Sequence, residues 1–395
     1  MQDPLPIDDP RKRWPSELVD NWAGPSKRVA IVGNQAFALL NFRSSLIAAL
    51  VARGHEVMAI APNLDGDYGH RIQQLGARPI SLPLSRRSTN PFADAVLFAR
   101  MVSALWSSRP DVILAYTAKP IVYGLPAAVL AGVRYRYALV EGLGLPLITG
   151  AHSAPRLLAQ MVRLLYRMAI RAASTCFFLN RSDLADFVSW KIVKPERALL
   201  LGATGVNLDD WPASKPVLDP VTFIFVGRLL RQKGVEEFVA AARLVKTDHP
   251  AVRFLLVGGF DEGHDAVHHQ TVQGWVREGV VEWTGHVPVR PWLDQSSVFV
   301  LPSYREGFPR STQEAMAVGR AVITTDVPGC RDTVVSGRNG ILVEPRDAGG
   351  LAAAMREFIA KPELIISMGL ESRAISEKQF DSRSFDARLI QHMGL

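Results

Sequence analysis

The stretch Tyr304-Arg-Glu-Gly-Phe-Pro-Arg-Ser-Thr-Gln-Glu-Ala-Met316 joins a short apolar run to a helix-forming sequence. The apolar run, 298–301, predicts a buried strand, and the Gly-Phe-Pro triplet predicts a tight turn. Glu306 therefore lies in a turn and Glu314 in the helix that follows. Such a turn offers free backbone N–H groups and the positive end of a helix dipole, which suit a phosphate. Two carboxylates beside a phosphate site suit hydroxyl groups, so the stretch indicates a nucleotide sugar.

The same alternation of strand and helix runs through both halves of the chain. In the first half, a strand at 28–33, a helix at 42–53 and a strand at 55–61 form a βαβ unit. Further strands are expected at 79–82, 112–114, 137–140 and 175–179, and in the second half at 222–226, 254–257, 281–283, 298–300, 321–324 and 341–343. This pattern predicts an α/β fold with two doubly wound parallel sheets, each covered on both faces.

The sequence divides into four segments. A stretch rich in proline and small residues, 211–217, separates the two halves. We expect a flexible N-terminal tail at 1–26, a first domain at 27–212, a second domain at 213–381 and a C-terminal helix at 382–395. The carboxyl ends of the strands of both domains would then face a common cleft, where ligands bind in open α/β sheets.

Composition excludes several classes of protein. Apolar residues make up 48% of the chain and charged residues 21%, which is typical of a globular protein. No apolar run reaches the roughly 18–20 residues that span a bilayer. The two cysteines, Cys176 and Cys330, predict a reducing compartment rather than a disulfide framework. The net charge is +7, but zinc spacings and basic regions with heptads are missing, so nucleic acid is the least favoured anionic partner.

With these motifs the chain resembles the retaining glycosyltransferases of family 4, which have the GT-B fold of two Rossmann-like domains. The resemblance extends from roughly Lys27 to the C-terminus. In that family the first glutamate of a Glu-x7-Glu motif holds the donor sugar and the second holds the ribose, which assigns Glu306 and Glu314. An arginine and a lysine after the first strand of the second domain neutralise the donor diphosphate, which assigns Arg228 and Lys233. Fixed cations stabilise the leaving group, so we expect no metal and no cofactor.

The resemblance also implies donor contacts from the loops of the second domain, which makes that domain the nucleotide-sugar-binding one. The family uses backbone groups at the ends of two strands to hold the nucleotide base. A partly exposed histidine at 286 fits a plain surface loop equally well. The donor-binding residues assigned in this way, beside Glu314, are Gly227, Gly258, Thr284, His286, Gly307, Phe308, Pro309, Ser311 and Thr312.

The first domain is expected to bind the acceptor, but here the chain departs from the family. Relatives carry a glycine-rich pair after the first strand, whereas this chain has a single glycine. Many relatives also carry a histidine in the loop after the strand at 112–114, and this chain has none between His70 and His152. Glu141 fits an acceptor contact or a helix cap. The acceptor candidates are Gly33, Asn34, Arg43, Tyr116, Thr117, Lys119 and Glu141.

Four arginines recur at helical spacing in the first domain. Arg156, Arg163, Arg167 and Arg171 fall along one stripe of a predicted helix, beside apolar residues. Such a helix can lie on an anionic leaflet, or it can be an ordinary solvated face. The first alternative predicts a cytoplasmic protein on the inner face of the cell membrane.

Taken together, these features predict a retaining, metal-independent hexosyltransferase. It would move a hexose from a nucleotide diphosphate sugar to an acceptor hydroxyl, on a lipid-linked glycan of bacterial polysaccharide synthesis. One alternative is a UDP-sugar 2-epimerase of the same fold, although epimerases need several acid/base groups at the donor sugar. Another is a non-catalytic sugar-nucleotide or membrane-docking module, which loss of the donor residues would favour; all of them are present.

Overall fold

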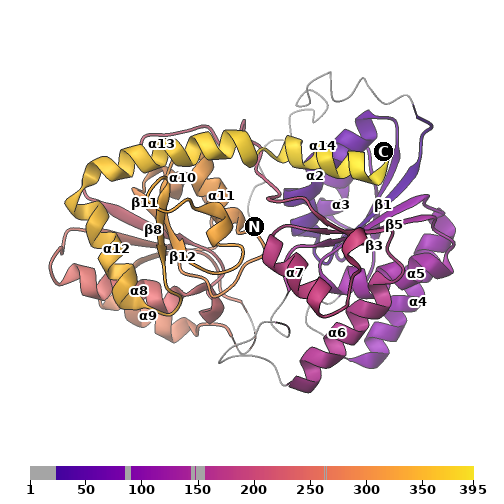
Figure 1. Cartoon of the computed structure of the whole chain (residues 1–395), viewed down its shortest axis with the longest axis horizontal. Helices are drawn as coiled ribbons and strands as arrows, with labels where there is room; N and C mark the ends of the chain where they lie inside the picture. Colours follow the sequence, from indigo (N-terminus) through magenta and orange to yellow (C-terminus); the bar gives the residue numbers. More distant parts are fainter. Residues whose placement is uncertain (1–23, 85–89, 144–146, 148–155, 262, 264) are drawn as a thin grey trace. The chain divides into compact units, whose positions relative to one another are not determined.

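The computed structural model describes residues 24–84, 90–143, 147, 156–261, 263 and 265–395, and it forms two compact units (Figure 1). One unit contains the described residues up to Gly202 together with Arg383–Leu395, and the other contains Ala203–Ser382. The predicted tail at 1–26 falls almost entirely outside the described residues.

The first unit is built on a parallel sheet of seven strands in the order β3-β2-β1-β4-β5-β6-β7. The chain passes from β1 to β2 and β3 on one side and then crosses to β4 on the other, so the strand order reverses between β1 and β4. The strands are β1 (Arg28–Val32), β2 (Glu56–Ala61), β3 (Arg78–Ser81), β4 (Val112–Tyr116), β5 (Tyr135–Val140), β6 (Thr175–Phe178) and β7 (Ala198–Leu200). The helices are α2 (Ala36–Ala52), α3 (Asp67–Gln74), α4 (Pro91–Ser108), the π-helical turn η2 (Pro120–Gly124), α5 (Leu125–Leu130), α6 (Arg156–Ile170), α7 (Arg181–Ser189) and the 3-10 turn η4 (Pro195–Arg197).

The second unit repeats the arrangement with six parallel strands in the order β10-β9-β8-β11-β12-β13. Its strands are β8 (Thr222–Val226), β9 (Arg253–Val257), β10 (Glu282–Gly285), β11 (Val298–Leu301), β12 (Ala321–Thr325) and β13 (Gly340–Val343). Its helices are α8 (Val235–Lys246), α9 (His269–Arg277), α10 (Arg290–Asp294), α11 (Arg310–Ala317), α12 (Ala348–Ala360) and α13 (Pro362–Gln379), with 3-10 turns η5 (Arg231–Lys233) and η6 (Arg331–Thr333). The two doubly wound parallel sheets that the alternation predicts are therefore confirmed.

Apolar strand sequences explain where the cores lie. All five residues of β4 and all five of β8 are buried, as expected for strands with helices on both faces of the sheet. In the second unit, Phe223 stacks on Phe254 with ring centroids 5.5 Å apart, and Phe238 from α8 packs edge-on against Phe254 at 6.0 Å. The central strands are thus fixed by their own hydrophobicity, and the loops at their ends are free to carry polar groups.

The last helix, α14 (Ser382–Met393), makes side-chain hydrogen bonds with the first unit. Ser45 donates to Asp386 at 2.5 Å, and Tyr137 donates its hydroxyl to the carbonyl of Met393 at 3.1 Å. Arg53 reaches the carbonyl of Leu395 at 3.0 Å. The chain therefore contributes its final helix to the unit in which it began.

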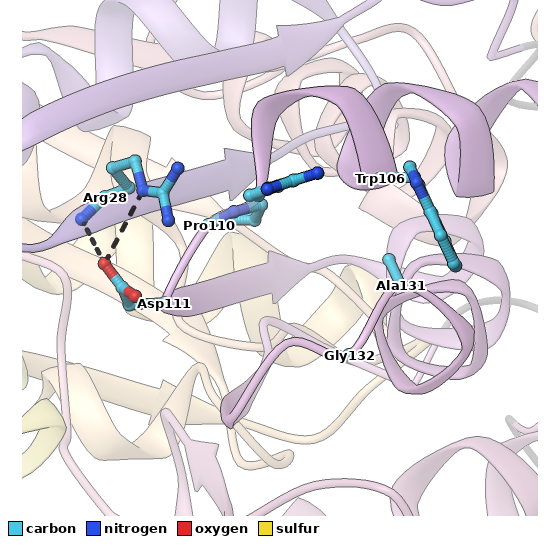
Figure 2. Close-up of a pocket in the computed structure, with 7 residues that line it drawn as sticks. Arg28, Trp106, Pro110, Asp111, Ala131 and Gly132 are labelled. Carbon is cyan, nitrogen blue, oxygen red and sulfur yellow. Dashed lines mark hydrogen bonds and ion pairs between the residues drawn. The ribbon is translucent and has the colours of Figure 1, made fainter.

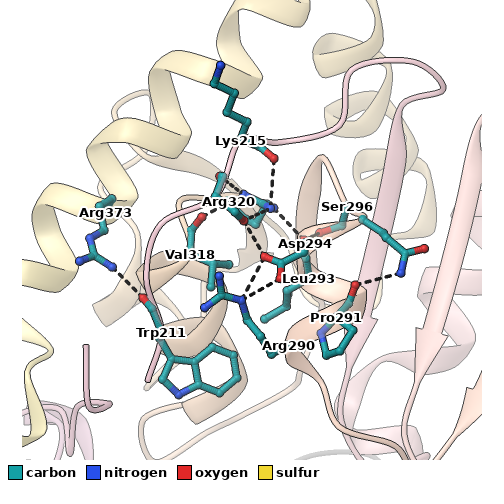
Figure 3. A network of polar contacts seen from close by, with 12 residues as sticks. Trp211, Lys215, Arg290, Pro291, Leu293, Asp294, Ser296, Val318, Arg320 and Arg373 are labelled. Carbon is teal, nitrogen blue, oxygen red and sulfur yellow. Dashed lines mark hydrogen bonds and ion pairs between the residues drawn. The ribbon is translucent and has the colours of Figure 1, made fainter. Parts of the chain in front are cut away.

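The segment that opens the second unit is held by the buried guanidinium of Arg320 (Figure 3). This side chain is fully buried and donates to the carbonyls of Leu293 at 2.9 Å, Ser214 at 2.7 Å and Val318 at 2.9 Å. Burial lowers the pKa of Arg320 to about 10, which still leaves it charged at neutral pH. One cation thus ties the proline-rich segment near Ser214 to two helix ends. The second unit itself starts at Ala203, upstream of the 211–217 break expected from the sequence, so the segment near Ser214 lies inside it.

Replacing Arg320 with alanine should lower the free energy of unfolding by at least about 3 kcal/mol, because several buried carbonyls lose a charged donor together. Urea unfolding of the full chain measures the loss. Arg243→Ala is the matched control: Arg243 pairs with Glu278 at 2.7 Å on the exposed surface, and its loss should cost under about 1 kcal/mol. Equal effects of the two substitutions would contradict the structural role of Arg320.

Candidate active site

Lys233 and Glu306 meet at the carboxyl edge of the second sheet. They are 73 positions apart, yet Nζ of Lys233 lies 2.5 Å from Oε1 of Glu306. The loop after β8 carries the lysine and the turn after β11 carries the glutamate, and these two strands are neighbours. Ser303 also donates to Oε1 at 2.7 Å. Within the described residues Oε2 of Glu306 has no hydrogen-bond partner, so one carboxylate oxygen can accept a bond from a ligand.

A close backbone contact fixes the turn that carries Glu306. Its N–H donates to the carbonyl of Pro328 at 3.1 Å. Gly329 has φ +80°, and a Cβ built there would lie 2.3 Å from the carbonyl oxygen of Glu306. Only glycine fits at that position. Cys330 is buried beside the turn, and burial together with the charge of Glu306 raises the pKa of the thiol to about 12.

Arg228 lies in the same loop as Lys233 but points to another carboxylate. Its guanidinium forms an ion pair with Asp261, and its side chain is 42% exposed. Gly258 approaches this loop so closely that a Cβ built on it would lie 1.8 Å from the carbonyl oxygen of Gly227. The loops after β8 and β9 are therefore in direct backbone contact, which brings both predicted cations to one edge of the sheet.

The second predicted carboxylate, Glu314, lies inside α11. Arg310 donates to it at 3.1 Å across one helical turn, and burial nevertheless raises the pKa of Glu314. Earlier in the helix, the hydroxyl of Thr312 is buried without a hydrogen-bond partner. Gln313 accepts a bond from the N–H of Gly205 at 2.8 Å and so anchors the helix to the start of the unit.

The remaining donor candidates follow the same edge. Pro309 precedes α11, and Ser311 is half-buried in its first turn. The ring of Phe308 packs against Phe380 with centroids 5.5 Å apart, so a donor contact at this position falls to the backbone of Gly307 and Phe308. Thr284 lies in the last part of β10 and His286 directly follows that strand; a Cβ on Gly259 would lie 3.1 Å from Cβ of His286.

In the first unit, Arg43 is the centre of a buried polar cluster. It forms an ion pair with Glu141, donates to the carbonyl of Phe42 at 2.8 Å and lies 5.1 Å from the ring centroid of Tyr116. The hydroxyls of Tyr116 and Thr117 are buried without hydrogen-bond partners, and burial raises the pKa of Tyr116. Two unsatisfied hydroxyls beside an ion pair are costly unless a ligand binds them.

Gly33 and Asn34 follow β1 at the same edge. A Cβ on Gly33 would lie 2.1 Å from the hydroxyl oxygen of Tyr116, so the single glycine makes room for that ring. Asn34 lines a pocket of 530 Å³ together with Phe37 and Tyr68. Lys119 instead pairs with Asp94 of α4 at 2.7 Å, which the sequence did not indicate.

A second pocket of the first unit lies away from these residues (Figure 2). It has a volume of 310 Å³ and is lined by Arg28, Trp106 and Asp111 among others. Arg28 opens β1 and Asp111 directly precedes β4, so this pocket lies at the amino edge of the sheet. Ligands of open α/β sheets bind at the carboxyl edge, so we assign it no part in the site.

Two of the four arginines of the predicted α6 stripe are engaged within the first unit. Arg163 lies over the ring of Trp190 at 4.1 Å, and Arg167 donates to the carbonyls of Trp190 at 2.7 Å and Lys191 at 3.2 Å. Both guanidinium groups therefore face the end of α7. The described part of α6 instead exposes an apolar stripe.

No group of three or more His, Cys, Asp or Glu residues in the described part of the chain is arranged to hold a metal ion. No described helix is long and apolar enough to cross a membrane.

Two family models match the chain one after the other. The model of the "glycosyl transferase 4-like domain" matches residues 42–203. The model of "glycosyl transferases group 1" matches residues 220–361. The chain belongs to the family 4 glycosyltransferases. The predicted enzyme class is therefore confirmed, and the epimerase and the non-catalytic module are not supported.

Relatives and solved structures agree with this assignment. The chain is 27% identical over 92% of its length to the N,N'-diacetylbacillosaminyl-diphospho-undecaprenol alpha-1,3-N-acetylgalactosaminyltransferase of Campylobacter jejuni, and the match covers 97% of that protein. Sucrose-phosphate synthase from Thermosynechococcus elongatus is similar in structure, with a TM-score of 0.76, 20% identity and coverage of 93% of this chain and 98% of that one. The Anabaena protein HepE in complex with UDP-glucose gives a TM-score of 0.72, 16% identity and coverage of 93% and 99%. These likenesses confirm the GT-B fold class.

Sequence reasoning missed several partners of the assigned residues. Asp261, Ser303 and Arg310 each contact one of the assigned residues, but no pattern in the sequence gave them this part. Only the adjacency of strands far apart in the sequence brings Asp261 to Arg228. The direct contact between Lys233 and Glu306 was likewise invisible in the sequence, although both residues were identified.

Gly329→Ala should lower turnover at least about tenfold although it removes no polar group, because its Cβ displaces the backbone of Glu306. Gly337→Ala is the matched control: Gly337 has φ +77°, but nothing lies within 4 Å of a Cβ built there. It should cost about 1 kcal/mol of stability and leave turnover unchanged. Steady-state kinetics on both variants measures the difference, and equal activities would contradict the constraint.

Proposed function

We propose that this enzyme transfers a hexose, with retention of configuration, from a nucleotide diphosphate sugar to a hydroxyl of a lipid-linked glycan at the inner face of the membrane. The observation that supports this proposal most is the contact between Lys233 and Glu306 at the carboxyl edge of the second sheet. One group suits phosphate and the other suits sugar hydroxyls, as the junction between a diphosphate and its sugar requires.

The chemistry follows from the charges of these groups. Lys233 and Arg228 would neutralise the diphosphate as the bond between the anomeric carbon and the phosphate oxygen breaks. Oε2 of Glu306 would accept a bond from a sugar hydroxyl, and Glu314 would accept one from the ribose. The new bond forms on the face that the phosphate leaves, and the departing phosphate oxygen takes the acceptor's proton. This route needs no histidine base, and the loop after β4 supplies none.

The relatives support both substrates. The Campylobacter enzyme is named for a diphospho-undecaprenol acceptor, and HepE was solved with UDP-glucose. We propose the same classes here: a nucleotide diphosphate sugar in the second unit and a polyprenyl diphosphate-linked sugar in the first. The hydroxyls of Tyr116 and Thr117, buried without partners, would pair with acceptor hydroxyls.

Turnover by the full chain with a panel of nucleotide sugars and a polyprenyl diphosphate-linked saccharide tests the reaction. Retention predicts that the product has the anomeric configuration of the donor, which NMR of the new linkage reports. Conversion of the donor sugar without an acceptor would favour an epimerase instead. Inverted product would overturn the proposed mechanism.

Glu306→Gln should lower turnover by at least about 100-fold, since preorganised contacts to the reacting sugar contribute roughly 3 kcal/mol or more. The amide keeps the size of the side chain but removes the charge that pairs with Lys233. Glu278→Gln changes an exposed carboxylate in the same way and serves as the control. Near-native turnover by a folded Glu306→Gln variant would contradict the assignment of this residue to the donor site.

Arg228→Ala and Lys233→Ala should each weaken binding of the nucleoside diphosphate, because phosphate charge is left uncompensated. Calorimetry in excess chelator measures the affinity for the nucleoside diphosphate. The wild type should keep its full affinity under these conditions, since we propose that the two cations replace a metal. Arg231→Ala is the control from the same loop, because Arg231 pairs with Glu236 at 3.2 Å. Unchanged affinity in both test variants, or loss of wild-type binding in chelator, would contradict this proposal.

A further inference from the structure

Helix α6 exposes an apolar face that no described part of the chain covers. Leu157, Met161, Leu164, Leu165 and Met168 are between 37% and 68% exposed. Their spacing of four, three, one and three residues places them along one side of a helix. The opposite side holds the helix in its unit through the buried residues Tyr166, Ala169 and Ile170.

The apolar side chains on this face of α6 are grouped more closely than those of an ordinary protein surface. Single exposed apolar side chains are ordinary, but five on adjacent turns of one helix form a contiguous patch of the kind that marks an interaction site. In Figure 1, α6 lies on the outside of its unit.

The sequence that contains this helix is mostly cationic. From 112 to 182 the sequence contains a single carboxylate, Glu141, and that group already pairs with Arg43. The same stretch contains the cations Lys119, Arg134, Arg136, Arg156, Arg163, Arg167, Arg171 and Arg181. Of these, Arg134, Arg171 and Arg181 are exposed. The partner should therefore combine apolar and anionic character.

We propose that the apolar face of α6 inserts into the interface of a bilayer that contains anionic lipid. An anionic bilayer supplies both features, since acyl chains take the leucine and methionine side chains while head groups face the arginines. A second copy of this chain would bring the same exposed arginines, such as Arg171 directly after α6, to the shared surface, so self-association is disfavoured. This inference deepens the membrane partner of the proposed function and concerns how the membrane is held.

The mode of binding differs from electrostatic docking. The guanidinium groups of Arg163 and Arg167 are engaged with Trp190 and the carbonyl of Lys191, so apolar contact contributes most. Salt shortens the Debye length from roughly 10 Å at 0.1 M to roughly 3 Å at 1 M and weakens only the electrostatic part. Binding that persists in high salt is the signature that distinguishes the two modes.

Co-sedimentation of the full chain with phosphatidylglycerol-phosphatidylcholine vesicles, without sugar or acceptor, tests the inference. We expect binding at low salt that falls less than about tenfold at 1 M salt. Met161→Gln/Leu164→Gln should lower partitioning at least about tenfold, because each apolar side chain left in water forfeits roughly a factor of ten. Ile366→Gln/Leu370→Gln is the matched control, since these exposed residues share a spacing of four on α13 of the other unit. That control should bind as the wild type does.

The outcomes separate this inference from the proposed reaction. A wild type that ignores anionic vesicles at low salt would overturn it, as would binding that is abolished at 1 M salt and unaffected by Met161→Gln/Leu164→Gln. Sedimentation showing a dimer that the same variant dissociates would assign the face to a second copy instead. The α6 variant should retain turnover on a short water-soluble acceptor, whereas a failed reaction with intact vesicle binding would count against the proposed function alone.

Discussion

Three glycines let the loops at the carboxyl edge of the second sheet touch through their backbones. A Cβ on Gly258 would lie 1.8 Å from the carbonyl oxygen of Gly227, one on Gly234 would lie 2.1 Å from that of Pro302, and one on Gly329 would lie 2.3 Å from that of Glu306. All three have positive φ, which other residues rarely adopt. The close approaches hold Lys233 and Glu306 in contact. The proposed donor site therefore depends on the lack of a side chain at these three glycines as well as on its charged residues.

The polar cluster of the first unit works by a different constraint. Arg43 is buried and paired with Glu141, which offsets the cost of removing its charge from water. The same cluster leaves the hydroxyls of Tyr116 and Thr117 without partners, and Thr117 has φ +67°. Strain and unsatisfied groups concentrate where a ligand is bound. The cluster therefore gives up stability in the free protein at the place where an acceptor hydroxyl would be held.

The sequence predicted the parts of the fold that hydrophobicity alone decides. Buried strands such as β4 and β8 are unbroken apolar runs, so their positions were correct. The edge strand β7 was missed because Ala198–Leu200 is only three residues long, which is too short to show a strand pattern. Helix α2 begins at Ala36, earlier than expected, because Gln35 gives no side-chain cap to mark its start.

For the site as for the fold, local sequence patterns were informative and contacts between separate strands were not. Glu306, Arg228 and Lys233 were assigned through the resemblance to the glycosyltransferase family, whose motifs are marked in the sequence by a turn and by framing glycines. Their partners were not, because Asp261 reaches Arg228 only through the pairing of β8 with β9. Such contacts depend on tertiary structure, which periodicity and spacing do not describe.

Helix α6 shows how a helical pattern can be recognised while its orientation is misjudged. Arginines and leucines both recur on this helix, and spacing does not say which set faces the protein. Trp190 and Lys191 decide it: they follow α7, whose last carbonyls have no partner inside the helix. Arg167 donates to the carbonyls of both residues, and a cation at this end also favours the helix dipole. Arg163 covers the ring of Trp190. Arg163 and Arg167 are thus drawn inward by the end of a neighbouring helix, and the leucines and methionines are left facing out.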